Sequence, residues 1–154
     1  MSETLLLKRA STDDVDAIRA LVRETYGKWV PVIGREPLPM QADYAEAVKN
    51  HQIDVLFWGD TLAGLIEMIP KDDHLLIENI AIAPACQGKG LGRKLLNHAE
   101  QVAQSLGHSE IRLYTNKLFA ENVEIYLKTG YKIDREETWT GGIIVHMRKS
   151  LRAA

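Results

Sequence analysis

The sequence predicts one α/β (α+β) domain over residues 1–154, with a mixed, mostly antiparallel sheet of six to seven strands and helices on both faces. Three observations predict this fold. Three strand-like segments in succession precede a glycine-rich turn, a helix links that turn to a further strand, and a short helix separates that strand from a closing hairpin. Strands joined by tight turns pair antiparallel, whereas a helical connection favours a parallel pair with a right-handed crossover.

The composition is that of an ordinary globular chain, with 45% apolar and 26% charged residues. The formal charge of −2 argues against a general nucleic-acid or membrane partner. The single cysteine, Cys86, excludes an internal disulfide and suits a reducing compartment. There is no apolar run long enough to span a bilayer and no leader-like N-terminus, so we expect a cytoplasmic protein.

The N-terminal third predicts a strand over 5–10 and a helix that begins near Ser11 and runs to about residue 26. The segment 28–40 is too rich in proline and glycine for a long helix, yet too apolar for a solvated loop. A second helix is expected over 41–50. This segment either walls a substrate pocket or merely caps one end of the sheet.

The middle of the chain predicts three consecutive antiparallel strands and then the glycine turn. The strands span 53–58, 62–69 and 75–82, separated by turns at 59–60 and 70–74. Glycines at every second position, 88, 90 and 92, then lead into a helix that ends near Gly107. A glycine turn at a helix N-terminus offers backbone N–H groups and a partial positive charge, which together favour a phosphate.

The spacing of these glycines discriminates among phosphate-binding motifs. The dinucleotide fingerprint G-x-G-x-x-G is missed by one residue, and the P-loop fails because Gly90 follows Lys89. The pattern that does fit is Gln87-x-x-Gly90-x-Gly92 directly after a strand. A glycine-rich turn without any ligand is the alternative.

The C-terminal third predicts a strand over 110–115, parallel to the one before the turn, and a short helix over 119–128. A closing hairpin of strands 131–135 and 142–147 follows, with Trp139 and Gly141-Gly142 between them. These closing strands could also pair across a homodimer.

The glycine pattern resembles the acyl-CoA signature [Q/R]-x-x-G-x-[G/A] of the GNAT superfamily of N-acetyltransferases, and the order of elements resembles that fold over nearly the whole chain. The resemblance implies acetyl-CoA as cosubstrate and a small-molecule or peptide amine as acceptor, with direct acyl transfer. It also implies that the two strands flanking the turn helix splay apart around the cofactor. The implied pyrophosphate site is the turn, made by Gln87, Gly88, Lys89, Gly90, Leu91 and Gly92, with charge from Arg93 or Lys94. The implied pantetheine site is the strand backbone of Ile80, Ala81 and Ile82.

Two catalytic roles follow from the same resemblance. Tyr126, in Tyr126-Leu-Lys-Thr-Gly-Tyr131, matches the family's Y-x-x-x-G-[F/Y] motif and would donate a proton to the departing thiolate. Glu78 is the expected base and Glu67 a weaker option, because a half-buried carboxylate can have a raised pKa. Alternation places Glu78 on the face of Ile80 unless a bulge intervenes. Members of the family often have an asparagine six residues before this tyrosine, and this sequence has none there. Asn116 and Asn122 are therefore both candidates for holding the cofactor or orienting the tyrosine.

Other polar residues carry weaker indications. The five histidines show no metal-ligand spacing, and His98 is expected on the solvated side of its helix, so we predict no metal. Cys86 is expected to be a small turn residue rather than a nucleophile. In the 26–50 segment, Arg35 can pair a carboxylate and Glu36 an ammonium of the acceptor. A non-catalytic acyl-CoA-binding module is the main functional alternative, and a nucleotide-binding enzyme a lesser one.

Overall fold

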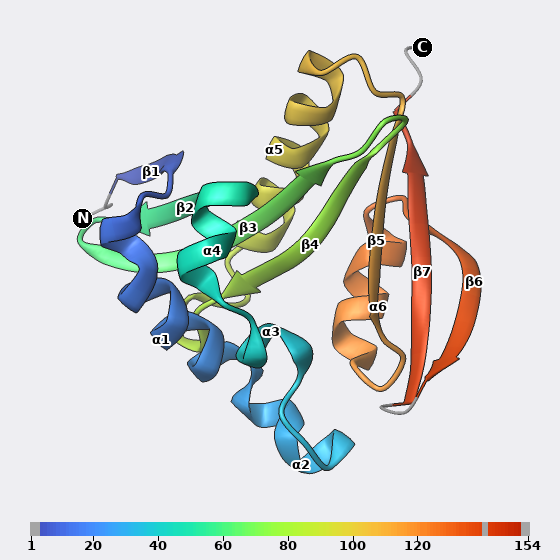
Figure 1. The fold of residues 1–154 in the computed structure, drawn as a ribbon, viewed down its shortest axis with the longest axis horizontal. Helices are drawn as coiled ribbons and strands as arrows, with labels where there is room; N and C mark the ends of the chain where they lie inside the picture. The colour runs from blue at the N-terminus through green and yellow to red at the C-terminus, as the bar shows by residue number, and fades with distance from the viewer. Residues whose placement is uncertain (1–3, 140–141, 152–154) are drawn as a thin grey trace.

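A computed structural model describes residues 4–139 and 142–151. Seven strands form one sheet in the order β1-β2-β3-β4-β5-β7-β6, which confirms the predicted mixed sheet (Figure 1). The pair β4–β5 is parallel, and the other five neighbouring pairs are antiparallel. The strands are β1 (Leu5–Arg9), β2 (Gln52–Trp58), β3 (Thr61–Pro70), β4 (Leu75–Ile82), β5 (Glu110–Asn116), β6 (Lys132–Trp139) and β7 (Gly142–Ser150).

Helices cover both faces of the sheet. Helices α1 and α4 lie in front of β2, β3 and β4 in Figure 1, whereas α5 lies behind them. Two four-residue helices, α2 and α3, connect α1 to α4. None of the helices in the described residues is long and apolar enough to cross a membrane. The helices are α1 (Val15–Tyr26), α2 (Val30–Ile33), α3 (Leu38–Gln41), α4 (Tyr44–Asn50), α5 (Leu91–Ser105) and α6 (Ala120–Lys128).

Local sequence signals explain where the helices begin and end. The Ser11 backbone N–H donates to the Asp14 carboxylate at 2.8 Å, and the Ser11 side chain accepts from the Asp13 N–H, which closes a capping box before α1. Helix α4 begins after Asp43, whose carboxylate accepts from the Glu46 N–H. Gly107, with φ of 79°, follows the end of α5 as predicted.

Helix α5 is held to the sheet by its apolar face and by part-buried polar contacts from His98 and Glu100. Leu95, Leu96 and Ala99 are fully buried against the strands. Contrary to the prediction, His98 does not face solvent: its Nε2 lies 2.7 Å from a carboxylate oxygen of the buried Asp54 on β2. A single polar residue on an otherwise apolar helix face gives no periodic signal, so the sequence alone did not indicate this contact.

The parallel pairing between β4 and β5 is short, so the two strands separate within the sheet. Pairing covers only Leu75, Leu76 and Ile77 on β4, after which the two strands separate. At the same point β4 bulges against β3, because Glu67 pairs with Asn79 while Met68 pairs with Ile77, leaving Glu78 between them. The strand separation implied by the family resemblance is therefore present, and it begins at the bulge.

Side chains of α1 take the place of a neighbouring strand along the open part of β4. The Thr25 hydroxyl donates to the Ile82 carbonyl at 3.1 Å, and the Tyr26 hydroxyl lies 3.1 Å from the Ile80 carbonyl. The Thr25 bond satisfies the Ile82 carbonyl, which the departing β5 leaves unpaired, whereas the single hydroxyl proton of Tyr26 is donated to the nearer Asn79 Oδ1 at 2.6 Å. Both bonds also fix the C-terminal end of α1 against the separated strand.

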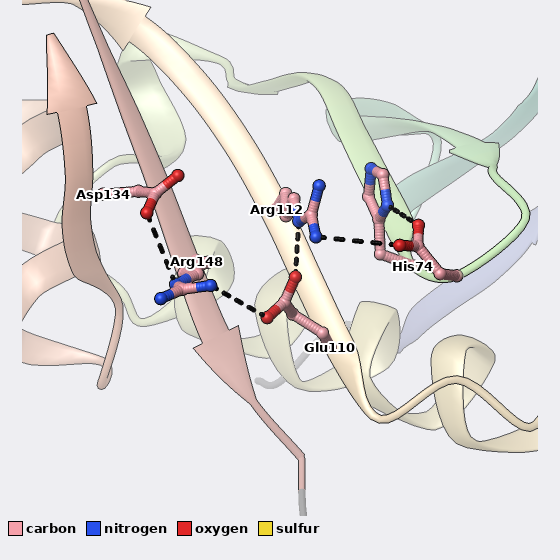
Figure 2. A network of polar contacts seen from close by, with 6 residues as sticks. His74, Glu110, Arg112, Asp134 and Arg148 are labelled. Carbon is pink, nitrogen blue, oxygen red and sulfur yellow. Dashed lines mark hydrogen bonds and ion pairs between the residues drawn. The ribbon is translucent and has the colours of Figure 1, made fainter.

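The paired end of β4 and β5 carries a chain of alternating charges (Figure 2). Arg112 on β5 lies between Asp73 and Glu110, and Arg148 on β7 lies between Glu110 and Asp134 on β6. Arg112 and Arg148 are direct cross-strand partners, so Glu110 separates two like charges. Exposed pairs contribute little singly, but this chain links the strands at the end that stays closed.

The predicted boundaries differ from the structure in three places. The segment 28–40 contains α2 and α3 where irregular chain was expected, and the next helix starts at Tyr44 rather than near residue 41. Trp139 was placed in a turn, but it is the last residue of β6. Strand β6 is an edge strand exposed along most of its length, so it has no apolar alternation to reveal its extent. Gly141 lies outside the described residues.

Gly64 on β3 gives a stability prediction for the packing beneath the open strand. A Cβ at this position would lie 2.8 Å from Ile82 Cδ1 and 2.9 Å from the Ala81 carbonyl oxygen, and the backbone atom cannot move cheaply. We expect Gly64→Ala to lower the free energy of unfolding by about 1–3 kcal/mol in urea titrations.

Gly27→Ala is the matched control, because Gly27 has φ of −56° and a Cβ added to it would meet no atom within 4 Å. This change should stabilise the protein by about 0.4–1 kcal/mol by restricting the unfolded chain. Equal effects of the two substitutions would contradict the packing account of Gly64.

Candidate active site

Two clefts meet at the separated strands. The first, here called the turn cleft, has a volume of about 390 Å³ and is bordered by the end of α1, β4, the glycine turn and α6. The second, the loop cleft, has a volume of about 330 Å³ and is bordered by the 33–51 segment, β4, β5 and Trp139. Four residues line both clefts: Tyr26, Ile80, Asn122 and Tyr126. These four residues form a wall common to both clefts, where ligands bound in the two clefts would come closest.

The glycine turn is shaped to receive an anion. Gly88 and Gly90 have φ of 77° and 81°, values that side chains disfavour, and both line the turn cleft. Gly90 is the N-cap of α5, has no side-chain cap, and is followed by a first turn without acidic residues. The unpaired N–H groups and the helix dipole of this 15-residue helix both favour negative charge. The Arg93 side chain lines the same cleft.

Of the remaining turn residues, some line the turn cleft and Lys89 does not. Gln87 lines the cleft and donates through Nε2 to the Ile82 carbonyl at 3.0 Å, which ties the turn to β4. Leu91 and Gly92 are also on the wall. The Lys89 ammonium lies 5.8 Å from the Trp58 ring centroid, and the residue is off the wall. Cys86 is buried beside the turn and also lines the turn cleft.

Along β4, alternate residues have different surroundings. Ile80 and Ile82 line the turn cleft. Ala81 is buried, pairs with Leu65 of β3, and is off the wall. The backbone edge that an extended ligand could reach is therefore that of Ile80 and Ile82.

Tyr126 projects from α6 to the junction of the clefts. The residue is 8% exposed, and burial raises the pKa of its hydroxyl. That hydroxyl has no hydrogen-bond partner among the described residues, so it is not consumed by a local structural bond. The Tyr126 ring packs edge-on against Tyr131, with centroids 6.0 Å apart.

The two candidate asparagines are distinguished by their surroundings. Asn122 lies on the shared wall, on the same helix as Tyr126. Asn116 lines only the loop cleft, and its Oδ1 accepts from the Leu118 N–H at 2.9 Å in a local turn. The position of Asn122 suits a contact with a ligand in either cleft.

Both candidate bases face the loop cleft. Glu78, at the bulge, accepts from the Tyr114 hydroxyl at 2.6 Å across the separating strands. Burial, and secondarily this hydrogen bond, raises the pKa of Tyr114. Glu67 is 4% exposed and lies 2.6 Å from His51 Nδ1. Burial raises the pKa of Glu67, although the bond to His51 opposes the shift.

Sequence reasoning missed a buried network behind the shared wall. Asn79, 5% exposed, accepts from the Tyr26 hydroxyl at 2.6 Å and donates through Nδ2 to the Tyr44 hydroxyl at 3.1 Å. Tyr44 in turn donates to the Pro39 carbonyl at 2.6 Å. This network joins α1, α4 and the α3 segment to β4, and burial raises the pKa of Tyr26.

Sequence reasoning also missed His51. No spacing in the sequence links this residue to Glu67, which approaches it only because β2 and β3 pair. Among residues 4–139 and 142–151, no three side chains of metal-ligating type are grouped in a way that could hold an ion.

Comparison with known proteins gives the family. The sequence pattern of the acetyltransferase (GNAT) family matches residues 15–131. Streptothricin acetyltransferase of Streptomyces lavendulae is 33% identical over 60 residues, which cover 39% of this chain and 32% of that protein. The uncharacterized N-acetyltransferase YvbK of Bacillus subtilis is 32% identical over 76 residues, 49% of each chain. This chain thus matches only a third to a half of the length of these curated relatives.

Solved structures match the fold over nearly the whole chain. The PaiA N-acetyltransferase from Thermoplasma acidophilum, solved in complex with coenzyme A, superposes with a TM-score of 0.80 at 19% identity, covering 96% of this chain and 99% of that one. The protein therefore belongs to the acetyltransferase (GNAT) family.

Proposed function

We propose that the protein is an N-acetyltransferase that moves an acetyl group from acetyl-CoA directly to a primary amine of a small molecule or peptide, in a ternary complex. The observation that carries this proposal is the meeting of two clefts at Ile80 and Tyr126. Direct transfer requires that donor and acceptor reach one point from separate sites, which this arrangement provides.

The turn cleft suits acetyl-CoA. Its glycine turn presents backbone N–H groups to the pyrophosphate, and Arg93 adds positive charge. The edge of β4 at Ile80 and Ile82, where the Ile82 carbonyl already accepts from Thr25 and Gln87, offers its remaining backbone groups for strand-like hydrogen bonding to the amide groups of the pantetheine arm. The early separation of β5 leaves this edge accessible. The thioester then supplies the activated acetyl group at the shared wall.

Tyr126 is proposed to assist the departing thiolate. Its pKa is raised by burial, so the hydroxyl stays protonated across the physiological range. A weakly acidic phenol donates a hydrogen bond to a developing thiolate more readily than it transfers its proton outright. The absence of a competing partner among the described residues leaves this bond available.

Glu78 is proposed to accept the proton of the amine, directly or through water, while Tyr114 holds its carboxylate in place. The Glu67–His51 pair is a second carboxylate in the same cleft. Burial raises the pKa of Glu67, so this carboxylate accepts a proton more readily than a solvated one. The backbone N–H at Ile80 is proposed to stabilise the oxyanion.

We also infer that residues 1–154 form one domain, that the protein acts in the cytoplasm, and that a homodimer forms through the closing strands. The continuous seven-stranded sheet supports the first inference, and the lone buried Cys86 suits the second. The exposed edge strand β6 is a surface on which a second sheet can pair.

The direct test measures release of free CoA thiol across a panel of amines, amino acids and peptides. We expect release that depends on both acetyl-CoA and an amine, because the two clefts bring the substrates together. Acetyl-CoA binding without turnover on any amine would instead select the non-catalytic acyl-CoA-binding module.

Tyr126→Phe tests the role of the hydroxyl. We expect turnover to fall by about 10²-fold while the affinity for acetyl-CoA changes by less than about threefold, because the bond forms only as the thiolate develops. Tyr131→Phe is the matched control: its hydroxyl is buried and has no hydrogen-bond partner among the described residues, and the residue lines neither cleft. Similar losses in both variants, or in turnover and affinity alike, would contradict the assignment.

Glu78→Gln tests the base. We expect kcat/KM to fall by about 10²-fold at neutral pH, since the amide cannot accept the ammonium proton. Glu46→Gln removes an exposed carboxylate from the rim of the same cleft and should change kcat/KM by less than about twofold. If Glu67→Gln abolishes activity while Glu78→Gln does not, the base is Glu67.

A further inference from the structure

One cation in the loop cleft has no part in the chemistry proposed above. Arg35 lies between α2 and α3 and lines the cleft. Its guanidinium carbon is 4.4 Å from the centroid of the Trp139 ring, also on the wall. Its Nε is buried and has no hydrogen-bond partner among the described residues. An ionised donor left in this state is stabilised when a ligand supplies the missing acceptor.

The segment that carries Arg35 is held in place. Gly34, with φ of 78°, ends α2 with its N–H bonded to the Val30 carbonyl at 2.8 Å. Beyond Arg35, the Gln41 side chain donates to the Glu36 carbonyl at 2.7 Å, and Tyr44 holds the Pro39 carbonyl. A guanidinium fixed by its backbone and stacked on an indole loses little freedom on binding.

The nearest acidic residue in sequence does not neutralise this cation. The Glu36 carboxylate lies 3.6 Å from Arg23 on α1 and is off the cleft wall. Of the two acceptor contacts that the sequence suggested, Arg35 with a carboxylate and Glu36 with an ammonium, only Arg35 faces the cleft. No carboxylate of the described residues lies within ion-pair distance of it.

The other side chains of the cleft that can carry a charge near neutral pH are carboxylates, apart from His51, which is bonded to Glu67. Glu67 and Glu78 lie on the sheet wall, where the reacting amine is proposed to bind. Two exposed carboxylates, Asp43 and Glu46, also border the cleft, but they are screened by solvent and Asp43 caps α4. A cation on the loop wall and carboxylates on the sheet wall match an acceptor that carries both a carboxylate and an amine. A polyamine would instead place a second cation against Arg35.

We propose that Arg35, stacked on Trp139, binds the carboxylate of the acceptor, and that the acceptor is therefore an amino acid. The planar N–H edge of a guanidinium fits a carboxylate through two parallel hydrogen bonds. This inference rests on the proposed acetyl transfer and assigns its substrate class.

The test compares amino acids with their carboxamides, which keep the size and the α-amine but lack the negative charge. For the wild type we expect kcat/KM to be about 10- to 100-fold higher for the acid, mainly through KM. Arg35→Gln should remove this preference by lowering kcat/KM for the acid about 10- to 100-fold while leaving the amide within about threefold. Arg35→Lys should retain part of the preference for the acid, because the positive charge remains but the two parallel hydrogen bonds of the guanidinium are lost.

Arg23→Gln is the matched control, since it removes a guanidinium that pairs with the same segment outside the cleft. It should leave the acid-to-amide ratio within about twofold. Affinity for acetyl-CoA should be unchanged in all variants, because Arg35 and Arg23 lie off the turn cleft. A thermal melt identifies any variant that is unfolded, and Arg35→Lys then serves in its place.

The possible failures are distinguishable. Turnover of amines with no preference for the carboxylate, or an equal loss for acid and amide in Arg35→Gln, overturns the Arg35 assignment and leaves acetyl transfer standing. Absence of turnover with every amine overturns acetyl transfer. In that case calorimetric titration of amino acids and amides into the acetyl-CoA-bound protein decides the Arg35 assignment, and equal affinity for both overturns it.

Discussion

The architecture depends on the end of strand pairing at Glu78. There the parallel pair β4–β5 stops and β4 bulges against β3, so one residue marks both the bulge and the separation. Separating two strands in the middle of a sheet exposes backbone groups that must find other partners. The Thr25 hydroxyl donates to one of these carbonyls, that of Ile82, and the Tyr26 hydroxyl lies close to another, that of Ile80. The remaining edge is the surface on which we propose that the cofactor is held.

The same separation borders both clefts, with Tyr126 on their shared wall and Glu78 in the loop cleft. Glu78 and Tyr114 face each other across the diverging strands, 2.6 Å apart through their side chains. Tyr126 reaches the opening from α6, and the Asn79 network fixes α1 and α4 against the strand from the other side. At the closed end, the charges around Glu110 and Arg112 link neighbouring strands. The ion pairs thus link the strands at the closed end, and the Asn79 network supports the open end.

Much of the fold was predictable because it follows from local patterns. The amphipathic spacing of α1 and α5, the turn at 59–60 and the glycines at 88–92 each act through neighbouring residues, so they are visible in the sequence. The edge strand β6 was predicted too short because its exposed residues carry no alternation. The contact between His98 and Asp54 was missed because it joins two elements 44 residues apart in the chain.

The sequence by itself determined the order of the elements, the parallel crossover into β5 and a glycine turn at the N-terminus of α5, because periodicity, capping and glycine conformation are short-range properties. It also supplied candidate residues without saying which of them meet. Only the tertiary structure decided that Tyr126 and Asn122 lie on the wall of both clefts, that Glu67 pairs with His51, and that Arg35 rather than Glu36 faces the loop cleft. These outcomes depend on strand register, on the bulge at Glu78 and on helix docking, which arise from contacts between residues distant in the chain.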